Sequence, residues 1–471
     1  MAPNPLAPSW LKVPEDPNAL VPGLWSRTVV REAGDGVLSV GGVPVTALAE
    51  RFGTPLYVVD EAEVRERAAD VRAAFQEAFA GVGTAAKVYY AGKAFLSIEV
   101  ARWMAGAGLN IDVCSGGELA VALAAGVAAD RLGFHGNNKS EAEIEAAVSA
   151  GVGAIVIDSV QEIDRVAAAA SRHGVVQPVR LRVNSGVHAH THAFLATAHD
   201  DQKFGIALPD AAAAVARIRE HGSLAFLGLH GHIGSQIFGA DGFAESASRL
   251  LAVHRELLAG GDVPELNLGG GFGIAYTAAD DPAPIAELAH RIAETVAASC
   301  TRLGIPLPVV AFEPGRSIIG RAGLTLYTVG TTKEVLAAAQ DGGETAVRRY
   351  VSVDGGMSDN ARPALYEADY SARIAGRVSA APPVLVRVAG KHCESGDIVV
   401  HAEYLPADTA PGDLLAVPAT GAYCWTLASN YNYLGRPAVV AVRDGEARVI
   451  VKGESIEDLL ARDAAYEGAN G

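Results

Sequence analysis

The sequence predicts an α/β protein built from a (β/α)8 TIM-type barrel and a second, mainly antiparallel β-barrel or β-sandwich domain. Two observations predict this fold. Short runs rich in β-branched residues alternate with Ala-rich stretches of helical period over about residues 53–324, which is the pattern of βαβ units around a parallel sheet. From about residue 325 the alternation stops, and β-type runs separated by Gly, Pro and Asp turns follow one another.

Eight candidate strands fall in the alternating region, which is the number that a closed barrel needs. Preceded by an introductory LYVVD near residue 58, they are KVYYA from 87, LNIDV from 109, RLGFH from 131, AIVID from 154, PVRLRV from 178, LAFLGLH from 224, PELNLG from 264 and PVVAFEP from 308. The segments between them have helical period and end near Gly. A doubly wound sheet is the competing fold, but it usually has fewer strands and a G-x-G-x-x-G motif after the first, which this chain lacks.

The predicted organisation has four segments. Residues 1–24 form an N-terminal arm, and residues 25–52 contribute short strands around an Asp-Gly turn to the β-domain. Residues 53–324 form the barrel, and residues 325–471 form the C-terminal β-domain. A chain of 471 residues with 50% hydrophobic composition is long enough for two such cores.

Composition and charge exclude several classes of protein. The formal net charge is −16 with acids and bases interspersed, so the clustered basic face that nucleic acid or an anionic membrane requires is not expected. The N-terminus lacks the basic and apolar regions of a signal peptide, and no apolar run approaches the roughly 20 residues of a membrane span. The four cysteines are widely spaced without a C-x-x-C pair, which is typical of a reducing cytoplasm. We therefore expect a cytoplasmic protein.

Polar residues able to take part in chemistry follow every predicted barrel strand. They are Lys93, Asp112, His135, Asp158, Arg182 with Asn184, His230 with His232, the Gly269–Gly271 run, and Glu313. The carboxyl ends of all eight strands of a barrel converge on one rim, where barrel enzymes have their active sites. The sequence therefore predicts an active site at this rim.

Ten segments of the chain, in order, resemble the fold-type III decarboxylases that depend on pyridoxal 5'-phosphate (PLP). They are YYAGKAF, DVCSGGELA, FHGNNKS, DQKFGI, GHIGSQI, NLGGGFGIAY, EPGRS, VDGGMSDNARPALY, GKHCESGDI and GAYCW with SNYN. The resemblance covers about residues 25–465. It implies an alanine-racemase-like fold, PLP as cofactor, a small amino-acid substrate, and a homodimer with shared active sites.

The resemblance assigns cofactor roles that the chemistry of the residues supports. Lys93 is implied as the lysine that forms a Schiff base with the cofactor, because a partly desolvated amine can attack an aldehyde. Glu313 would keep the pyridine nitrogen protonated and the ring a strong electron sink, which favours decarboxylation. Glycine N–H groups with Arg316 and Ser235 would bind the phosphate. The implied cofactor residues are Lys93, Asp112, Arg182, His232, Ser235, Gly270, Gly271, Glu313, Gly315, Arg316 and Tyr423.

The resemblance also implies a substrate with amino and carboxylate groups at both ends, meso-2,6-diaminopimelate, which would give L-lysine and CO2. A bidentate arginine suits the distal carboxylate and an acidic side chain suits the distal ammonium. Cys393, from the neighbouring subunit, is implied as the proton donor to Cα. The implied substrate residues are Arg316, Arg362, Tyr366, Glu394 and Tyr423.

Other interpretations remain open at this point. A related decarboxylase of ornithine, arginine or a carboxylated polyamine needs no distal arginine, so Arg362 argues against it. An amino-acid racemase, a non-catalytic PLP carrier and a barrel without cofactor are the further alternatives. The HAHTH run from His188 to His192 could suggest a metal, but a loop is favoured and no metal is expected. Gly231 and Trp425 depart from the usual family residues and could alter the pocket.

Overall fold

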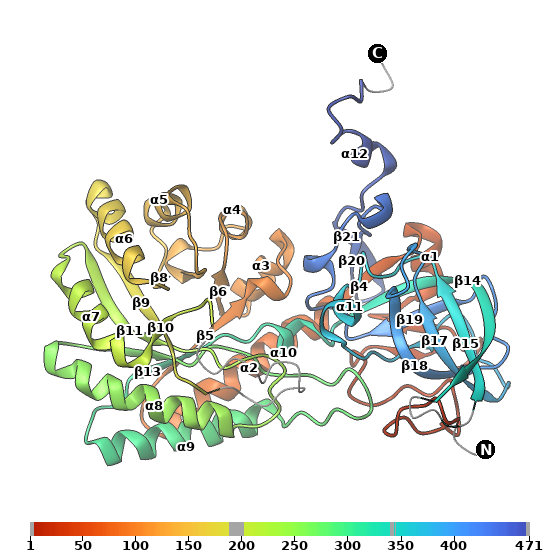
Figure 1. Ribbon diagram of the computed structural model, residues 1–471, viewed down its shortest axis with the longest axis horizontal. Coiled ribbons are helices and arrows are strands. Elements are labelled where there is room, and N and C mark those ends of the chain that lie inside the picture. Colours follow the sequence, from red (N-terminus) through yellow and green to blue (C-terminus); the bar gives the residue numbers. More distant parts are fainter. Residues whose placement is uncertain (1–3, 188–201, 340–342, 344, 468–471) are drawn as a thin grey trace. The chain divides into compact units, whose positions relative to one another are not determined.

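The computed structural model describes residues 4–187, 202–339, 343 and 345–467, so the HAHTH run lies outside the described residues. The chain forms two compact units (Figure 1). One, the barrel unit, comprises Arg65–Ile274 and Pro282–Ile318. The other, the β-domain, comprises the residues up to Val64, the stretch Ala275–Asp281 and the residues from Ile319 onward.

The barrel unit contains a closed parallel sheet of eight strands, each at a predicted position. They are β5 (Ala86–Ala91), β6 (Asn110–Val113), β7 (Leu132–Phe134), β8 (Ala154–Ile157), β9 (Gln177–Asn184), β11 (Leu224–His230), β12 (Glu265–Asn267) and β13 (Val309–Phe312). The pairing of β8 with β9 and of β13 with β5 closes the barrel. The two-residue strand β10 (Ile206–Ala207) is added beside β9. The predicted fold class is confirmed.

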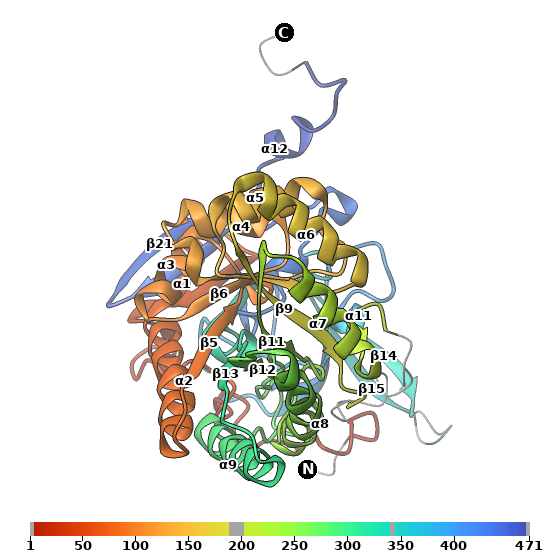
Figure 2. The ribbon, with the colours of Figure 1, turned by 90° about the vertical axis from the view of Figure 1, so that its left-hand side faces the viewer.

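Helices surround these strands (Figure 2). They are α2 (Glu61–Gly81), α3 (Ile98–Gly106), α4 (Gly116–Ala124), α5 (Glu141–Ala150), α6 (Val160–His173), α7 (Ala211–Glu220), α8 (Asp241–Leu257), α9 (Ile285–Leu303) and the short α10 (Arg316–Ile319). The side chain of Ser140 accepts a hydrogen bond from the Glu143 backbone and begins α5 with a capping box. Gly174 ends α6 in the left-handed conformation, which favours glycine because it has no Cβ.

The β-domain is a mixed, mainly antiparallel sheet with strand order β18-β17-β15-β14-β4-β20-β21, and β19 pairs with both β14 and β16. The strands are β4 (Leu56–Asp60), β14 (Gly323–Ala338), β15 (Thr345–Val353), β16 (Arg373–Ile374), β17 (Pro383–Ala389), β18 (Ile398–Pro406), β19 (Leu414–Pro418), β20 (Val439–Arg443) and β21 (Glu446–Val451). Its short helices are α1 (Val45–Phe52), α11 (Arg362–Tyr366) and α12 (Ile456–Leu460). The two parallel pairs are β15 with β17 and β4 with β20.

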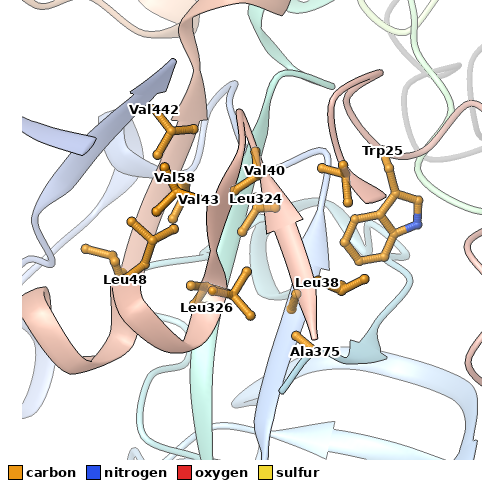
Figure 3. Close-up of a cluster of buried hydrophobic side chains, with 14 of the residues drawn as sticks. Trp25, Leu38, Val40, Val43, Leu48, Val58, Leu324, Leu326, Ala375 and Val442 are labelled. Atoms are coloured by element: carbon orange, nitrogen blue, oxygen red, sulfur yellow. The ribbon is translucent and has the colours of Figure 1, made fainter. Parts of the chain in front are cut away.

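The N-terminal strands pack on this sheet. Strands β1 (Val30–Arg31), β2 (Leu38–Val40) and β3 (Val43–Pro44) form a small antiparallel sheet of their own. Side chains of this sheet lie in one buried cluster with Val58 of β4 and Leu324 of β14 (Figure 3). Burial of these apolar side chains stabilises the attachment of the N-terminal segment to the β-domain.

The observed units divide the chain at somewhat different places from the predicted segments. The introductory strand LYVVD is β4, which pairs with β14 and β20 in the β-domain rather than with a barrel strand. The stretch Ala275–Asp281 also groups with the β-domain. Within the described residues, no helix is long and apolar enough to cross a membrane.

Candidate active site

The barrel unit holds a cavity of about 570 Å3 at the carboxyl ends of its strands. Five of the predicted residues line it, namely Lys93, Asp112, Arg182, His232 and Glu313. The other lining residues are Ala91, Cys114, His135, Gly136, Asn137, Gln202, Phe204, His230, Ile233 and Gly234. Side chains from several separate strand ends therefore meet in one cavity, as expected for a barrel active site.

Lys93 follows β5 in a single 3-10 turn, Gly92–Ala94, and its side chain is exposed while both neighbours are buried. A Cβ on Gly92 would lie 2.8 Å from the backbone oxygen of Asp112. The glycine therefore allows the end of β5 to pack closely on β6. This packing fixes the backbone from which Lys93 extends at the cavity.

Glu313 is a buried carboxylate on the wall of the cavity, and several side chains donate hydrogen bonds to it or lie close to it. Its Oε1 accepts a hydrogen bond from Asn267 Nδ2 at 2.7 Å and lies 3.0 Å from His230 Nε2. His135 Nε2 is 3.5 Å from the same oxygen. Burial alone would raise the pKa of Glu313, but His230 and His135 lower it well below its usual range. The structure therefore keeps a negative charge buried at this wall of the cavity.

The two histidines beside Glu313 are neutral near pH 7. Burial lowers the pKa of both His135 and His230 to about 4, against the opposing effect of Glu313. Neutral His230 can donate its Nε2 proton to Glu313, which leaves Nδ1 as an acceptor. Among the described residues this buried Nδ1 has no hydrogen-bond partner.

The ligand atoms of His135, His230 and Glu313 all lie within 4.8 Å of one another, a spacing that a metal ion could use. A metal-ligating histidine normally donates its second ring N–H to an acceptor. If His230 bound a metal through Nε2, its Nδ1 proton would be buried without an acceptor. The arrangement therefore favours a hydrogen-bonded cluster around Glu313 over a metal site.

Asp112 lies beside this cluster with the opposite electrostatic behaviour. Burial and the nearby charge of Glu313 raise its pKa well above the usual range. Within the described part of the chain, neither carboxylate oxygen of Asp112 has a hydrogen-bond partner, although His135 Nε2 is 3.1 Å away. Buried polar atoms are rarely left unpaired in native proteins. Unpaired atoms on Asp112 and His230 therefore fit a cavity that receives a polar cofactor such as PLP.

A cationic group marks the predicted phosphate end of the site. Arg316 Nη2 donates to the hydroxyl of Ser235 at 2.9 Å. Arg316 begins the helical turn α10 directly after Gly315, whose added Cβ would lie 3.0 Å from Ala91 and Ala94. The close packing of Gly315 therefore fixes the backbone immediately before the guanidinium.

The glycine run after β12 has a packing role in addition to the predicted phosphate role. The N–H of Gly269 donates to Asn267 Oδ1 at 2.8 Å, and that of Gly270 donates to His232 Nδ1 at 3.4 Å. A Cβ on Gly270 would lie 2.0 Å from the backbone oxygen of Glu313. The run therefore holds the His232 ring and lets the ends of β12 and β13 approach each other.

The remaining predicted residues belong to the β-domain and are not among the residues that line the barrel cavity. They are Arg362, Tyr366, Cys393, Glu394 and Tyr423. Arg362 begins α11 and is only 6% exposed. Its guanidinium lies 4.4 Å from the ring centre of Tyr276 and 5.4 Å from that of Tyr370, and Nη1 donates to the Tyr370 hydroxyl. These aromatic contacts fix the direction of the arginine.

Cys393 and Glu394 lie on an exposed loop between β17 and β18. The loop is anchored by Asp397, which accepts hydrogen bonds at 2.8 Å from both the backbone N–H and the Nδ1 of His392. Tyr423 has a left-handed backbone, with φ of 62°, and lies between two buried residues. All four cysteines, including Cys393, are free thiols.

Comparison with known proteins gives the same family from sequence and from structure. Residues 61–320 match the pyridoxal-binding domain of the pyridoxal-dependent decarboxylases. The diaminopimelate decarboxylase of Mycobacterium tuberculosis H37Rv is 50% identical over 450 residues, which cover 94% of this chain and 98% of the relative. That of Bacillus subtilis 168 is 44% identical, covering 93% and 97%.

The chain belongs to the diaminopimelate decarboxylase family. A crystal structure of diaminopimelate decarboxylase from M. jannaschii in co-complex with L-lysine has a TM-score of 0.83 at 31% identity, covering 93% of this chain and 98% of that chain. A lysine/ornithine decarboxylase from Vibrio vulnificus, at 21% identity and a TM-score of 0.68, shares the fold. The activity is therefore PLP-dependent decarboxylation of diaminopimelate in lysine biosynthesis, and the predictions of a carboxy-lyase and of its cofactor are confirmed.

The structure also shows contacts around Glu313 that the sequence did not assign. Asn267 and the pair His135 and His230 contact Glu313 but were not among the predicted site residues. The available signal for the histidines was their position at strand ends, since His135 directly follows β7 and His230 is the last residue of β11. Gly231, a departure from the usual family residue, faces Leu250, whose Cδ1 would lie 2.9 Å from an added Cβ, and it does not line the cavity.

Proposed function

We propose that the decarboxylation takes place in the barrel cavity, with Lys93 holding the cofactor and Glu313 facing its ring nitrogen. The observation that carries this proposal is a buried, ionised carboxylate on the wall of the cavity that Lys93 also lines. When bound, PLP supplies a protonated ring that accepts the electrons of the broken bond between Cα and the carboxylate. A negative charge at Glu313 favours that protonated ring.

Other predicted residues of the barrel unit would orient the cofactor. Arg316 with Ser235 provides a cation and a hydroxyl for the phosphate. His232, whose pKa is lowered by burial and by the charges of Lys93 and Arg182, would lie against the ring as a neutral imidazole. Arg182 stacks 4.2 Å from the ring centre of Phe204, which holds its side chain at the edge of the cavity.

The β-domain would supply the groups that recognise the distal end of meso-2,6-diaminopimelate. Arg362 would bind the distal carboxylate together with Tyr366, because a guanidinium can donate two parallel hydrogen bonds to a carboxylate. Glu394 would pair with the distal ammonium. Arg316 and Tyr423 would complete the contacts with the substrate.

Cys393 would complete the reaction by donating its thiol proton to Cα. The bond between Cα and the carboxylate breaks, CO2 leaves, and the new bond between Cα and hydrogen gives L-lysine. Lys93 would hold the cofactor between turnovers. A donor on an exposed loop suits this step, since the proton must be replaced before the next turnover.

We infer that the working unit is a homodimer in which Cys393 and Glu394 serve the site of the neighbouring subunit. Large apolar side chains are exposed on the β-domain, including Tyr366 at 59% and Tyr433 at 69%. Tyr431 stacks on the buried ring of His392, next to Cys393, and is itself 42% exposed. Exposed aromatic side chains are typical of surfaces that bind another protein. The expected cytoplasmic location stays a prediction.

The proposed substrate is tested with the purified full chain, PLP and meso-2,6-diaminopimelate, by measuring lysine and CO2. We expect lysine to form in equal amount to CO2. Arg362→Met should lower kcat/KM by about 100-fold through loss of the bidentate contact. Release of CO2 from ornithine without formation of lysine from meso-diaminopimelate would contradict the proposal.

A further inference from the structure

We propose that Asn432 is a positioning residue that holds the Cys393 loop in its working conformation. This inference rests on the proposed role of Cys393 as proton donor and adds a residue through which that role is set. Asn432 belongs to the SNYN segment, and no residue of that segment is among those that line the barrel cavity. Its side-chain oxygen Oδ1 accepts a hydrogen bond from the backbone N–H of Cys393 at 3.1 Å.

The backbone of Asn432 is adapted to this contact. It has φ of 53° and ψ of 26°, inside the 3-10 turn Tyr431–Tyr433. This left-handed conformation is uncommon for residues other than glycine, and asparagine is among the few that adopt it readily. Asparagine therefore satisfies two requirements at once, a left-handed turn and a side-chain acceptor.

The turn that carries Asn432 is itself anchored to the β-domain. The N–H of Ser429 donates to the backbone oxygen of Ser358 at 2.9 Å. The amide of Asn430 donates to Glu454 at 2.5 Å and to the backbone oxygen of Leu434 at 3.1 Å. Two of these bonds anchor the residues before Asn432, and the third closes the turn around it, which gives its side chain a fixed support from which to hold the loop.

The Cys393 loop is thus held at two neighbouring points. Asp397 fixes His392, and the flat ring of His392 stacks on Tyr431 with an interplanar angle of 3°. Asn432 fixes the next residue along the chain. A misplacement of a reacting group by about 1 Å can cost about 100-fold in rate, so a loop that carries a proton donor benefits from direct restraint. We expect loss of the Asn432 acceptor to lower kcat and, because Glu394 lies on the same loop, to raise KM as well.

The test separates the backbone requirement from the hydrogen bond. Asn432→Gly keeps the left-handed turn but removes the acceptor, whereas Asn432→Asp keeps both. In the full-length holoenzyme, we expect Asn432→Gly to lower kcat about tenfold and to speed amide hydrogen exchange in the segment 391–397. Asn432→Asp should retain most of the activity and the protection. Asp444→Gly is the matched control, because Asp444 is also left-handed, with φ of 52°, and lies in the turn between β20 and β21.

Two further results decide the proposal. If Asn432→Gly leaves amide exchange in 391–397 unchanged, Asn432 does not restrain the loop. If exchange becomes faster but kcat is unchanged, the restraint is not important for catalysis. In a Cys393→Ser background, Asn432→Gly should cause no further loss of kcat, and an undiminished loss would show a general structural effect instead. A Cys393→Ser variant with full activity would contradict the proposed role of Cys393, while the exchange measurement still decides whether Asn432 holds the loop.

Discussion

At the residue scale, the cavity places two buried carboxylates side by side and shifts their pKa values in opposite directions. Glu313 receives hydrogen bonds from Asn267 and His230, and its pKa is lowered, whereas Asp112 has no hydrogen-bond donor among the described residues and its pKa is raised. When two neighbouring carboxylates are buried, ionising both has a high free-energy cost. The donors around Glu313 decide which of the two carries the charge, and that charge is the one the proposed chemistry needs.

Replacing Glu313 by Gln removes this charge while keeping the shape. We expect kcat of Glu313→Gln to fall by about 100-fold or more, since a preorganised charge at a reacting group contributes several kcal/mol. PLP binding, followed by absorbance, should persist. The control is Glu265→Gln, which breaks the buried pair with Arg180. That variant should melt at a lower temperature but keep its kcat as a folded enzyme, and wild-type kcat in Glu313→Gln would contradict the assignment.

Tyr370 provides a second prediction, because its hydroxyl accepts a hydrogen bond from Arg362. Tyr370→Phe keeps the aromatic contact but frees the guanidinium to rotate. We expect KM for meso-diaminopimelate to rise about fivefold to tenfold with kcat nearly unchanged, in line with the loss of about one hydrogen bond. Tyr404→Phe is the matched control, because that buried hydroxyl has no hydrogen-bond partner among the described residues. Equal effects of the two changes on KM would argue against the role of Tyr370.

The chemical identity of the cavity residues was predictable from the sequence, but their pairing was not. Lys93, Glu313 and Arg316 stand out because they follow strand ends within recognisable motifs. The contact between Asn267 and Glu313 depends on β12 pairing with β13, and His135 reaches Glu313 only because the barrel closes. Such contacts join residues far apart in the chain, so local patterns do not specify them.

At the element scale, the strand pattern identified all eight barrel strands, yet it could not assign β4 to its sheet. All five residues of β4 are buried, and a fully buried strand has the same sequence signature in a barrel and in a mixed sheet. Its partners β14 and β20 lie more than 250 residues later in the chain. Only the pairing of distant segments reveals that β4 belongs to the β-domain.

Helix α8 provides a pH-dependent prediction, because it buries His254 away from the cavity. Burial lowers the pKa of His254 to about 4, while an unfolded histidine titrates at about 6.5. Between these values the unfolded chain binds more protons than the folded chain. The stability is therefore fully present above about pH 6.5 and falls as the pH decreases toward about 4.

The variant His254→Leu should remove this dependence. We expect its melting temperature relative to wild type to be higher at pH 5 than at pH 8 by about 2–5 °C, measured by calorimetry. His290→Leu on α9 is the control, because His290 is exposed. The same melting-temperature difference between His254→Leu and wild type at both pH values would contradict the prediction.

At the scale of the whole molecule, the proposed site residues are divided between two units that are discontinuous in sequence. The barrel unit carries all the proposed cofactor residues except Tyr423, and the β-domain carries Tyr423, Arg362, Cys393 and Glu394. The sequence predicted both units from their different patterns, because strands and helices alternate up to about residue 324 and strands follow one another after it. It could not define their boundaries, because the stretch Ala275–Asp281 has no composition that separates it from the barrel.

The proposed shared dimer makes a quantitative prediction for mixed subunits. Lys93→Ala and Cys393→Ala should each be nearly inactive alone. If each site combines residues of both subunits, mixing and exchanging the two variants gives hybrid dimers with one intact site. We expect recovery of about a quarter of the wild-type activity, since about half of the dimers are hybrids. No recovery after confirmed subunit exchange would contradict shared sites.

The central claim is that Lys93 holds PLP in the barrel cavity. Borohydride reduction of the holoenzyme, followed by digestion and mass spectrometry, locates the lysine that carries the cofactor. We predict a single modified peptide that contains Lys93, and no modification in Lys93→Ala. Cofactor attached to another lysine, such as the buried Lys139, or modification that survives in Lys93→Ala, would contradict the account.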